Sequence, residues 1–316
     1  MPAAKPPVII LTGPTATGKT ATAIRLASDV DIDVINGDSR LFYRGMDIGT
    51  AKPSKAERAI APHHLIDTLD PRDAMSLAQF QDQANALIVD IHARNRLPVI
   101  VGGTQQYINA VIEGWQIPRV APQPELRAQL QADAEQHGRE SLLARLKTLD
   151  PAAAASAGLN TRRIMRALEV ITVTGRPMSE LQGKRETTFS SHLIALSMPR
   201  TRLYERIDAR VHTMVEAGLV EEVASLLDKG ISPDTPAFSG IGYRQVIPYL
   251  QGDITLDQMI ERIQHDTHRL VRHQETWLRK STSAIWINVS EPGWYATLRS
   301  IVEAIPGVNT HGASES

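Results

Sequence analysis

An α/β fold, with a parallel sheet flanked by helices, is predicted by three features of this 316-residue sequence. Short apolar runs alternate with helical patterns as far as Thr104, which is typical of strands joined by crossover helices. The first apolar run leads into a glycine-rich turn, LTGPTATGKT. After Pro118 the strand pattern stops and helical patterns follow one another. The sequence therefore predicts a sheet-based core interrupted by an inserted all-helical domain.

The predicted core strands are short and buried, and they end in glycine or polar residues. The first lies at 8–13, and a helix with apolar residues at helical spacing follows it. A second strand is expected at 32–39. A capping box of Ser76 and Gln79 then opens a long helix before the third strand at 97–104. In such a sheet ligands bind at the carboxyl ends of the strands, so the three strand ends are expected to converge.

The helical insertion is expected to start after the proline-rich joint IPRVAPQPE and to return to the sheet with a strand at 191–198. The other predicted helices cover 125–137, 141–149, a short segment opened by Asp150-Pro151, 161–175, 203–217, 219–228 and 256–279. A last strand is expected in SAIWINV. The domain boundaries that follow are 1–121 and 191–305 for the core, 122–190 for the insertion and 306–316 for a disordered tail.

Composition excludes several kinds of site and partner. There is no cysteine, which rules out disulfides, thiolate zinc sites and thiol catalysis. The formal net charge is −1, so any nucleic-acid surface must be a local patch. The N-terminus lacks the features of a signal peptide, and no apolar stretch approaches the ~18 residues of a membrane span. We expect a cytoplasmic protein without a membrane partner.

The turn after the first strand has the spacing of a phosphate-binding loop. Gly13 is followed by four residues and then by Gly18-Lys19-Thr20. The glycines let successive backbone N–H groups point inward, and the next helix adds its positive end. Lys19 brings a mobile charge to the phosphates, and the Thr20 hydroxyl is placed to bind Mg²⁺. The loop predicts a P-loop nucleoside-triphosphatase-like core, although the motif alone fits any diphosphate or triphosphate.

Two polar residues at neighbouring strand ends are the candidate catalytic groups. Asp38 ends the second strand, where it can bind magnesium, cap a helix or accept a proton from a nucleophile. Thr104 follows the Gly102-Gly103 turn, and the simpler interpretation is a turn hydroxyl bonded to its own backbone. A carboxylate and a hydroxyl near one diphosphate suit transfer to an acceptor with an N–H or O–H.

Six segments together resemble the motifs of the tRNA dimethylallyltransferase family. They are, in order, GPTATGKT, DSRLFYRGMDIGTAKP, VGGTQQY, RALEV, GIGYRQ and TWLR, and the resemblance runs from about residue 8 to 288. YRGMDIGTAKP is much more specific than the phosphate loop. The resemblance implies transfer of a dimethylallyl group from dimethylallyl diphosphate to N6 of adenosine 37 of tRNA. It also implies that no ATP is needed and that the enzyme is a monomer.

The resemblance assigns roles to named residues. It implies that Asp38 is the general base and that Thr104 hydrogen-bonds near the reacting groups. Mg²⁺ would bind at Thr20. A channel through the protein would admit the base and the diphosphate from opposite sides. The implied diphosphate-binding residues are Gly13, Thr15, Ala16, Thr17, Gly18, Lys19 and Thr20.

An RNA surface is implied on both the core and the insertion. The target base must leave the anticodon-loop stack to reach the site. The implied tRNA-binding residues are Asp38, Ser39, Arg40, Leu41, Thr104, Arg127, Arg163, Arg166, Gly242, Tyr243 and Arg244. Arg162 belongs to the same basic helix, whose simpler interpretation is a solvated face. A second basic row at helical spacing is Arg262, His265, Arg269 and Arg272; it can line the channel, face the RNA or be solvated.

Several positions depart from the family pattern. Gly37 and Arg40 replace small or apolar residues, Gln105-Gln106 replaces a more apolar pair, and Ser239-Gly240 stands where a cysteine is frequent. His268 and His273 occupy positions where the family usually has arginines. A histidine there would carry less charge at neutral pH.

Two other functions fit parts of the sequence. One is a P-loop small-molecule kinase that uses ATP, with Arg162, Arg163 and Arg166 on a lid. The other is a non-enzymatic RNA-binding protein with a degenerate phosphate site. Both are ranked below the transferase, and the YRGMDIGTAKP stretch has no evident role in a generic kinase.

Overall fold

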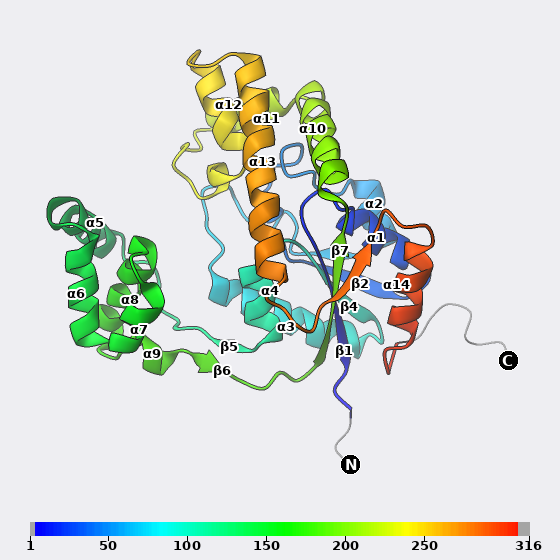
Figure 1. Ribbon diagram of the computed structural model, residues 1–316, viewed down its shortest axis with the longest axis horizontal. Helices are drawn as coiled ribbons and strands as arrows, with labels where there is room; N and C mark the ends of the chain where they lie inside the picture. Colours follow the sequence, from blue (N-terminus) through cyan, green and yellow to red (C-terminus); the bar gives the residue numbers. More distant parts are fainter. Residues whose placement is uncertain (1–3, 309–316) are drawn as a thin grey trace. The chain divides into compact units, whose positions relative to one another are not determined.

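The computed structural model describes residues 4–308, and a six-stranded parallel sheet forms the centre of its larger unit (Figure 1). The strand order is β3-β2-β4-β1-β7-β8. The strands are β1 (Pro7–Thr12), β2 (Ile32–Asn36), β3 (His63–His64), β4 (Leu97–Val101), β7 (Ser190–Ser197) and β8 (Ile285–Asn288). The predicted fold class is confirmed. The predicted strands were correct, except that the two-residue β3 was missed because so short a run has no periodicity.

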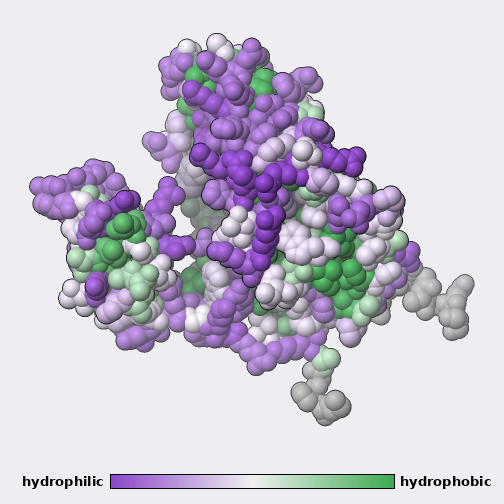
Figure 2. Space-filling view, viewed as in Figure 1, coloured by the Kyte–Doolittle hydropathy of each residue, from purple (hydrophilic) through white to green (hydrophobic). Residues whose placement is uncertain are grey.

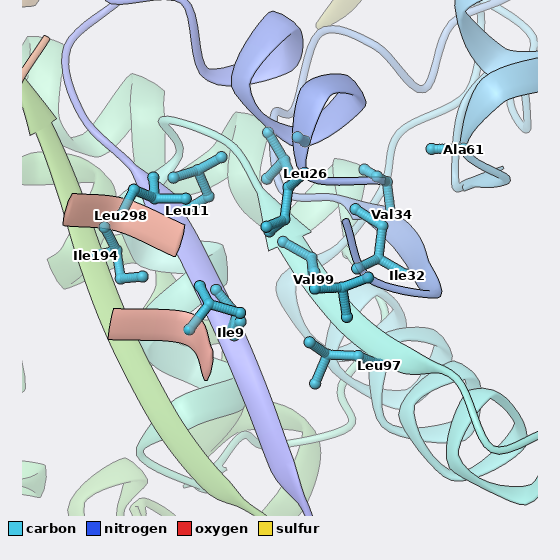
Figure 3. Close-up of a cluster of buried hydrophobic side chains, with 14 of the residues drawn as sticks. Ile9, Leu11, Leu26, Ile32, Val34, Ala61, Leu97, Val99, Ile194 and Leu298 are labelled. Carbon is cyan, nitrogen blue, oxygen red and sulfur yellow. The ribbon is translucent and has the colours of Figure 1, made fainter. Parts of the chain in front are cut away.

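Alternate side chains of β1 enter two different cores. Ile9 and Leu11 lie in the core that α1 (Lys19–Leu26) and α14 (Trp294–Glu303) cover (Figure 3). Val8 and Ile10 lie in the core on the other face, beneath α3 (Leu77–Ala93) and α4 (Gln105–Ile112). This two-residue period is what a strand covered by helices on both faces requires.

A third core lies in the helices that extend beyond the carboxyl ends of the strands (Figure 1). They are α10 (Arg200–Glu216), α11 (Leu219–Asp228), α12 (Tyr243–Leu250) and α13 (Leu256–Leu278), with the short 3-10 helix Ala237–Ser239. Tyr43 and Met46, from the loop between β2 and α2 (Lys55–Ile60), pack into this core. The loop after β2 is therefore held between the sheet and this helical layer.

A second compact unit covers 113–187. Its helices are α5 (Pro124–His137), α6 (Arg139–Leu149), α7 (Pro151–Ala157), α8 (Thr161–Thr174) and α9 (Met178–Leu181). The first and last segments of this unit pair with each other as two antiparallel strands, β5 (Trp115–Gln116) and β6 (Gly183–Lys184). The sequence analysis placed the insertion at 122–190, because these two-residue strands give no sequence signal. Of the tail expected at 306–316, residues 309–316 lie outside the described part.

Glu169 is the polar centre of this helical unit. Its side chain is fully buried, and it accepts hydrogen bonds from Arg127 (2.7 and 2.9 Å), Arg166 (2.5 Å) and the Gln123 backbone (2.7 Å). A buried carboxylate is stable only when cations and hydrogen bonds offset its desolvation. Around it the apolar core is formed by residues such as Leu130, Leu146, Ile164 and Leu168.

Among residues 4–308, no helix combines the length and apolar character that crossing a membrane requires.

Glu169→Gln is expected to destabilise the helical unit by about 3 kcal/mol, because it leaves two arginines without their buried carboxylate. Hydrogen exchange of the full chain should show faster exchange at 113–187 than elsewhere. Glu140→Gln is the matched control, because Glu140 is 68% exposed and should change stability by less than about 0.5 kcal/mol. Equal exchange in both variants would contradict this role of Glu169.

Candidate active site

The phosphate loop joins β1 to α1 and has a conformation that only glycine supports at two positions. Gly13 has φ +144°, and a Cβ there would lie 2.4 Å from the carbonyl oxygen of Leu196 in β7. Gly18 has φ +92° and begins α1. The buried Thr17 hydroxyl donates to the Pro14 carbonyl (2.9 Å). The loop is thus shaped by its own glycines and by contact with the neighbouring strand.

Positive charge is concentrated beside this loop. The Lys19 ammonium donates to the carbonyls of Gly13 (3.0 Å) and Pro14 (2.9 Å). Burial lowers the pKa of Lys19 to about 8; Asp38 opposes this effect and Arg210 adds to it. Burial also lowers the pKa of Arg210. Two cations that are partly removed from water favour the binding of an anion, because an anion offsets the desolvation that lowers both pKa values.

A cavity of about 340 Å³ opens over the loop. Lys19, Thr20 and Gly18 line it from the loop, and Arg206 and Arg210 line it from α10. The two arginines were not predicted as site residues. Their spacing of four within a predicted helix places them on one face, which was the available sequence signal. Gly13 and Thr17 do not line this cavity, and their part is to shape the loop.

Asp38 is held by hydrogen bonds at the end of β2. The buried Asn36 side chain accepts from the Asp38 backbone N–H (2.8 Å) and donates to the Asp38 carbonyl (3.0 Å). The Asp38 carboxylate accepts from the Arg40 backbone N–H at one oxygen, Oδ1 (3.0 Å). The orientation of the carboxylate is therefore fixed.

Thr104 is brought to Asp38 by a close contact between two glycines. A Cβ on Gly102 would lie 2.1 Å from the carbonyl carbon of Gly37, so the two strand ends touch through their backbones. Thr104 Oγ1 then accepts from the Ser39 backbone N–H (3.0 Å) and lies 3.3 Å from the Ser39 hydroxyl. The Thr104 hydroxyl thus belongs to a network between two loops, unlike the turn hydroxyl of the simpler interpretation.

A second cavity of about 480 Å³ lies on the other side of Asp38. It is lined by Ser39, Arg40, Thr104 and the segment 239–244. The residues that line both cavities are Thr15, Ala16, Asp38, Thr50 and Arg210. Asp38 therefore stands where two cavities meet. The phosphate loop with Lys19 lines the smaller one, and arginines line both.

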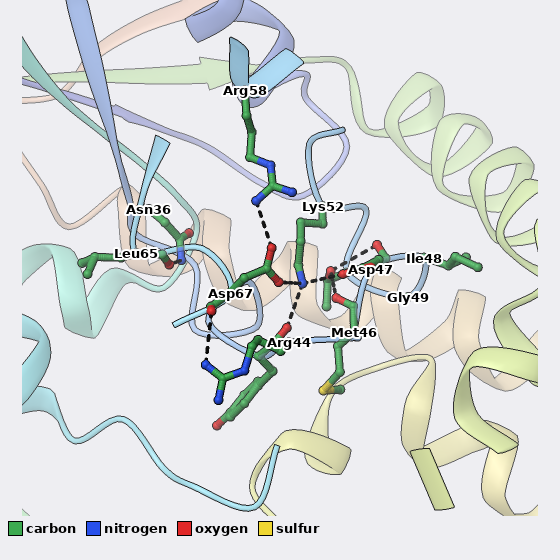
Figure 4. A network of polar contacts seen from close by, with 12 residues as sticks. Asn36, Arg44, Met46, Asp47, Ile48, Gly49, Lys52, Arg58, Leu65 and Asp67 are labelled. Carbon is green, nitrogen blue, oxygen red and sulfur yellow. Dashed lines mark hydrogen bonds and ion pairs between the residues drawn. The ribbon is translucent and has the colours of Figure 1, made fainter. Parts of the chain in front are cut away.

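The YRGMDIGTAKP stretch forms a loop that is held by the buried ammonium of Lys52 (Figure 4) and by the half-buried Glu222. The Lys52 ammonium, 3% exposed, contacts Asp47 and Asp67 at 2.5 Å and the Tyr43 carbonyl at 2.7 Å. Glu222 of α11 accepts hydrogen bonds from the backbone N–H groups of 47–49 (2.8–3.2 Å). These contacts hold the loop in place, and its residues also line the cavities: Gly49 and Thr50 line the larger one, and 50–53 line the smaller one.

Glu222 also holds one of the implied RNA-binding residues. The Tyr243 hydroxyl donates to Glu222 (2.5 Å), and burial together with that carboxylate raises the pKa of Tyr243. Arg244 pairs with Asp266 of α13 (2.6 Å). Gly242, Tyr243 and Arg244 all line the larger cavity, whereas Leu41 lines the smaller one.

The implied RNA-binding arginines of the helical unit differ in their surroundings. Arg127 and Arg166 both bind Glu169, and their side chains are 43% and 27% exposed. Arg163 is exposed and makes only a long contact with the Ser156 carbonyl (3.4 Å). Arg163 is therefore the arginine most available to a partner, while the other two also serve the core of the unit.

The second basic row lies on α13. Arg262, His265, Arg269 and Arg272 are exposed, and a strongly hydrophilic stripe follows this helix (Figure 2). Arg269 and His273 line the larger cavity. His268 lies elsewhere: its ring stacks on Tyr204 (3.9 Å between centroids) and lies 2.9 Å from Asp208.

Buried glutamines brace the loops of the site. Gln105 donates to the Thr12 hydroxyl (2.8 Å), which donates to the Gly102 carbonyl (3.0 Å). Gln274 of α13 bonds to both the phosphate loop and the Gly103 turn. The polar Gln105, which departs from the family pattern, is thus satisfied within the core.

The residues of the smaller cavity fit a magnesium ion held mainly by substrate. Mg²⁺ usually takes one or two protein oxygens, keeps several waters and completes its shell with phosphate oxygens. Thr20 supplies a hydroxyl to this cavity, and Asp38 lines it as well. Among the residues that the structure describes, no cluster of three or more acidic, His or Cys side chains could hold a metal ion.

Comparisons with known proteins agree with this site. The chain matches the family model described as IPP transferase over residues 41–281. A tRNA dimethylallyltransferase of Thermomicrobium roseum is 52% identical over 298 residues, which are 94% of this chain and 91% of that protein. Another, from a Roseiflexus species, is 53% identical over 275 residues, with 87% and 90% covered.

Solved structures give the same result. The full-length tRNA isopentenylpyrophosphate transferase of Bacillus halodurans matches with a TM-score of 0.70 and 39% identity, covering 95% of this chain and 96% of that one. A eukaryotic dimethylallyltransferase, described as acting on tRNA, has a TM-score of 0.78 over 94% of this chain and 78% of its own. At 24% identity it supports the fold alone. The phosphate loop, the braced Asp38–Thr104 pair and these matches together establish that the chain belongs to the IPP transferase family.

Proposed function

We propose that this protein is a tRNA dimethylallyltransferase that prenylates N6 of adenosine 37, next to the anticodon, and releases diphosphate. The observation that carries the proposal is the place of Asp38 at the junction of two cavities. One cavity has the cations that a diphosphate needs, and the other has room and polar groups for a base. A single proton acceptor, Asp38, between the two cavities suits transfer of the prenyl group from the diphosphate in one to the base in the other.

The leaving group binds in the smaller cavity. Backbone N–H groups of the phosphate loop, Lys19, Arg206 and Arg210 stabilise the charge that develops on diphosphate as the C–O bond breaks. The bond's electron pair leaves with the diphosphate. Mg²⁺ at Thr20 would add Lewis-acid stabilisation of the same oxygens. Lys19 and Arg210 are at least half-buried and lie beside the loop before substrate binds, so little reorganisation of these two cations accompanies the reaction.

The nucleophile enters from the larger cavity. The exocyclic N6 of adenine is weakly nucleophilic because its lone pair is delocalised into the ring, so loss of its proton must accompany attack. The N6–C bond forms on the face opposite the leaving oxygen, and the proton passes to Asp38. Thr104 and Ser39, which lie beside Asp38, supply hydrogen bonds that orient the base. The adenosine reaches them only when it leaves the anticodon-loop stack.

The protein surface supports binding of an RNA loop. Arg163 on the helical unit and the exposed basic row of α13 supply phosphate contacts, and the segment 242–244 meets the bases. We infer from the resemblance to the family that one chain is the functional unit. The kinase alternative is not favoured, because YRGMDIGTAKP belongs to the transferase family and its residues brace the site.

The test is a transfer assay with Mg²⁺, labelled dimethylallyl diphosphate and unmodified tRNA, with and without ATP. Labelling of tRNA without ATP is expected, and a tRNA with guanosine at position 37 should stay unlabelled. Lys19→Ala should abolish labelling. Consumption of ATP on another acceptor would favour the kinase, and tight RNA binding without turnover would favour a non-enzymatic RNA-binding protein.

Asp38→Asn should lower kcat by about 10²- to 10⁴-fold, the range for loss of a general base. The amide oxygen still accepts from the Arg40 backbone, so the loop should keep its shape. Affinity for tRNA, measured by filter binding, should change less than about threefold. Wild-type turnover in this variant would remove Asp38 from the role of base.

Affinity for the diphosphate should fall as pH rises through about 8, the pKa of Lys19. Below that pH the amine is charged and binds the anion; above it the charge is lost in the free protein. Between pH 7 and 9 the Kd of inorganic pyrophosphate should therefore rise about tenfold from this group.

Lys19→Arg is the control for this titration, because arginine keeps its charge throughout. The ratio of the two Kd values cancels the titration of pyrophosphate itself. A ratio that is constant from pH 7 to 9 would show that Lys19 does not titrate there.

A further inference from the structure

Gln274 connects the two halves of the candidate site from a third element. It lies on α13 and is 8% exposed. Its side-chain oxygen accepts from the Thr15 backbone N–H of the phosphate loop (2.9 Å). Its side-chain nitrogen donates to the Gly103 carbonyl (3.1 Å), next to Thr104. One buried amide therefore fixes the backbone of both loops.

The turn that carries Thr104 is shaped around this amide. A Cβ on Gly103 would lie 2.4 Å from Gln274 Nε2, so only glycine allows the approach. On the other side, the bond to Thr15 uses an N–H that would otherwise face the cavities. The Thr15 N–H is thus a part of the brace, and the remaining N–H groups of the loop are left for phosphate oxygens.

We propose that Gln274 is a positioning residue for group transfer: it keeps the diphosphate loop at a fixed distance from Thr104 and Asp38. This inference rests on the proposed function. In-line transfer requires the leaving oxygen, the carbon and the incoming N6 to align, and a misplacement of about 1 Å costs on the order of 10²-fold in rate. The leaving group is set by the phosphate loop and the nucleophile by the loops of Ser39 and Thr104. Because the Gln274 side chain is hydrogen-bonded to both the phosphate loop and the Gly103 turn, it fixes the distance between them.

The helix that carries Gln274 also borders the nucleic-acid side. Arg269 and His273 of α13 line the larger cavity, and α13 packs against α10, which carries Arg206 and Arg210. The helix α13 thus lines the larger cavity and, through the side chain of Gln274, is hydrogen-bonded to the phosphate loop and to the Gly103 turn.

Gln274→Leu removes both hydrogen bonds and keeps most of the side-chain volume. We expect kcat for prenyl transfer to fall about 10- to 100-fold, while KM for tRNA and the Kd of inorganic pyrophosphate change less than about threefold. The matched control is Gln81→Leu, which removes another buried glutamine that donates to a backbone carbonyl, that of Ala110 (2.6 Å). The control should lose stability and keep its kcat.

Gln274→Glu gives a readout that a purely structural role would not move. The carboxylate still accepts from Thr15, but it donates to Gly103 only when protonated, and burial raises its pKa. The ratio of its kcat to that of the wild type should therefore rise as pH is lowered from 8 to 6. The ratio also removes any effect of pH that both proteins share.

The outcomes separate this inference from the proposed function. If the wild type transfers no prenyl group, the proposed function fails, whatever the variants do. If the wild type is active and Gln274→Leu keeps its kcat, the inference is overturned. If the leucine variant does not fold, the glutamate variant decides: a rising ratio supports the brace, and a flat ratio overturns it.

Discussion

Buried positive charge facing one carboxylate is the constraint on which the rest of the structure depends. Lys19 and Arg210 are both removed from water, and Asp38 is the anion that offsets part of this cost. Such an arrangement is unfavourable without an anionic ligand, because desolvation depresses the pKa of each cation. It is stable only if the surrounding loops cannot relax away from it. The braces from Asn36, Glu222 and Gln274 meet this need, since each binds backbone groups of a loop that carries a charged or catalytic side chain.

The sequence predicted what is local and periodic. The phosphate loop needs only residues 13–20, and the ends of β2 and β4 follow from short apolar runs that stop at polar residues. The place of Asp38 beside Thr104 then follows from the parallel order of the strands. The braces could not be predicted in the same way, because Gln274 contacts Thr15 across 259 positions and Glu222 contacts Ile48 across 174. No pattern within a window of the sequence contains both partners of such a bond.

The most family-specific stretch both supports the site and borders it. Within YRGMDIGTAKP, Lys52 is almost fully buried and binds two aspartates and a carbonyl. Residues 49–53 also line the cavities. A substitution of Lys52 would leave the Tyr43 carbonyl and the partly buried Asp67 without this partner, which costs more than the net gain of the original bond. The loop therefore requires a lysine at this position. In the helical unit Glu169 sets a similar requirement: Arg127 and Arg166 must be arginines to satisfy its buried carboxylate, whether or not they also contact RNA.

The histidine at position 268 shows how a departure from the family pattern is tolerated. Its ring stacks on Tyr204 and faces Asp208, both on α10, and it lines neither cavity. The histidine therefore lies away from the cavity that is proposed to bind the diphosphate. Arg206 and Arg210 each follow one of these two residues by two positions, so they lie on a different side of α10. There they line the smaller cavity, and this helix supplies cations to it. Replacing the family's usual arginine by His268 therefore removes no cation from the smaller cavity. Lys19, Arg206 and Arg210 still line it, and the transfer reaction keeps the groups on which it depends.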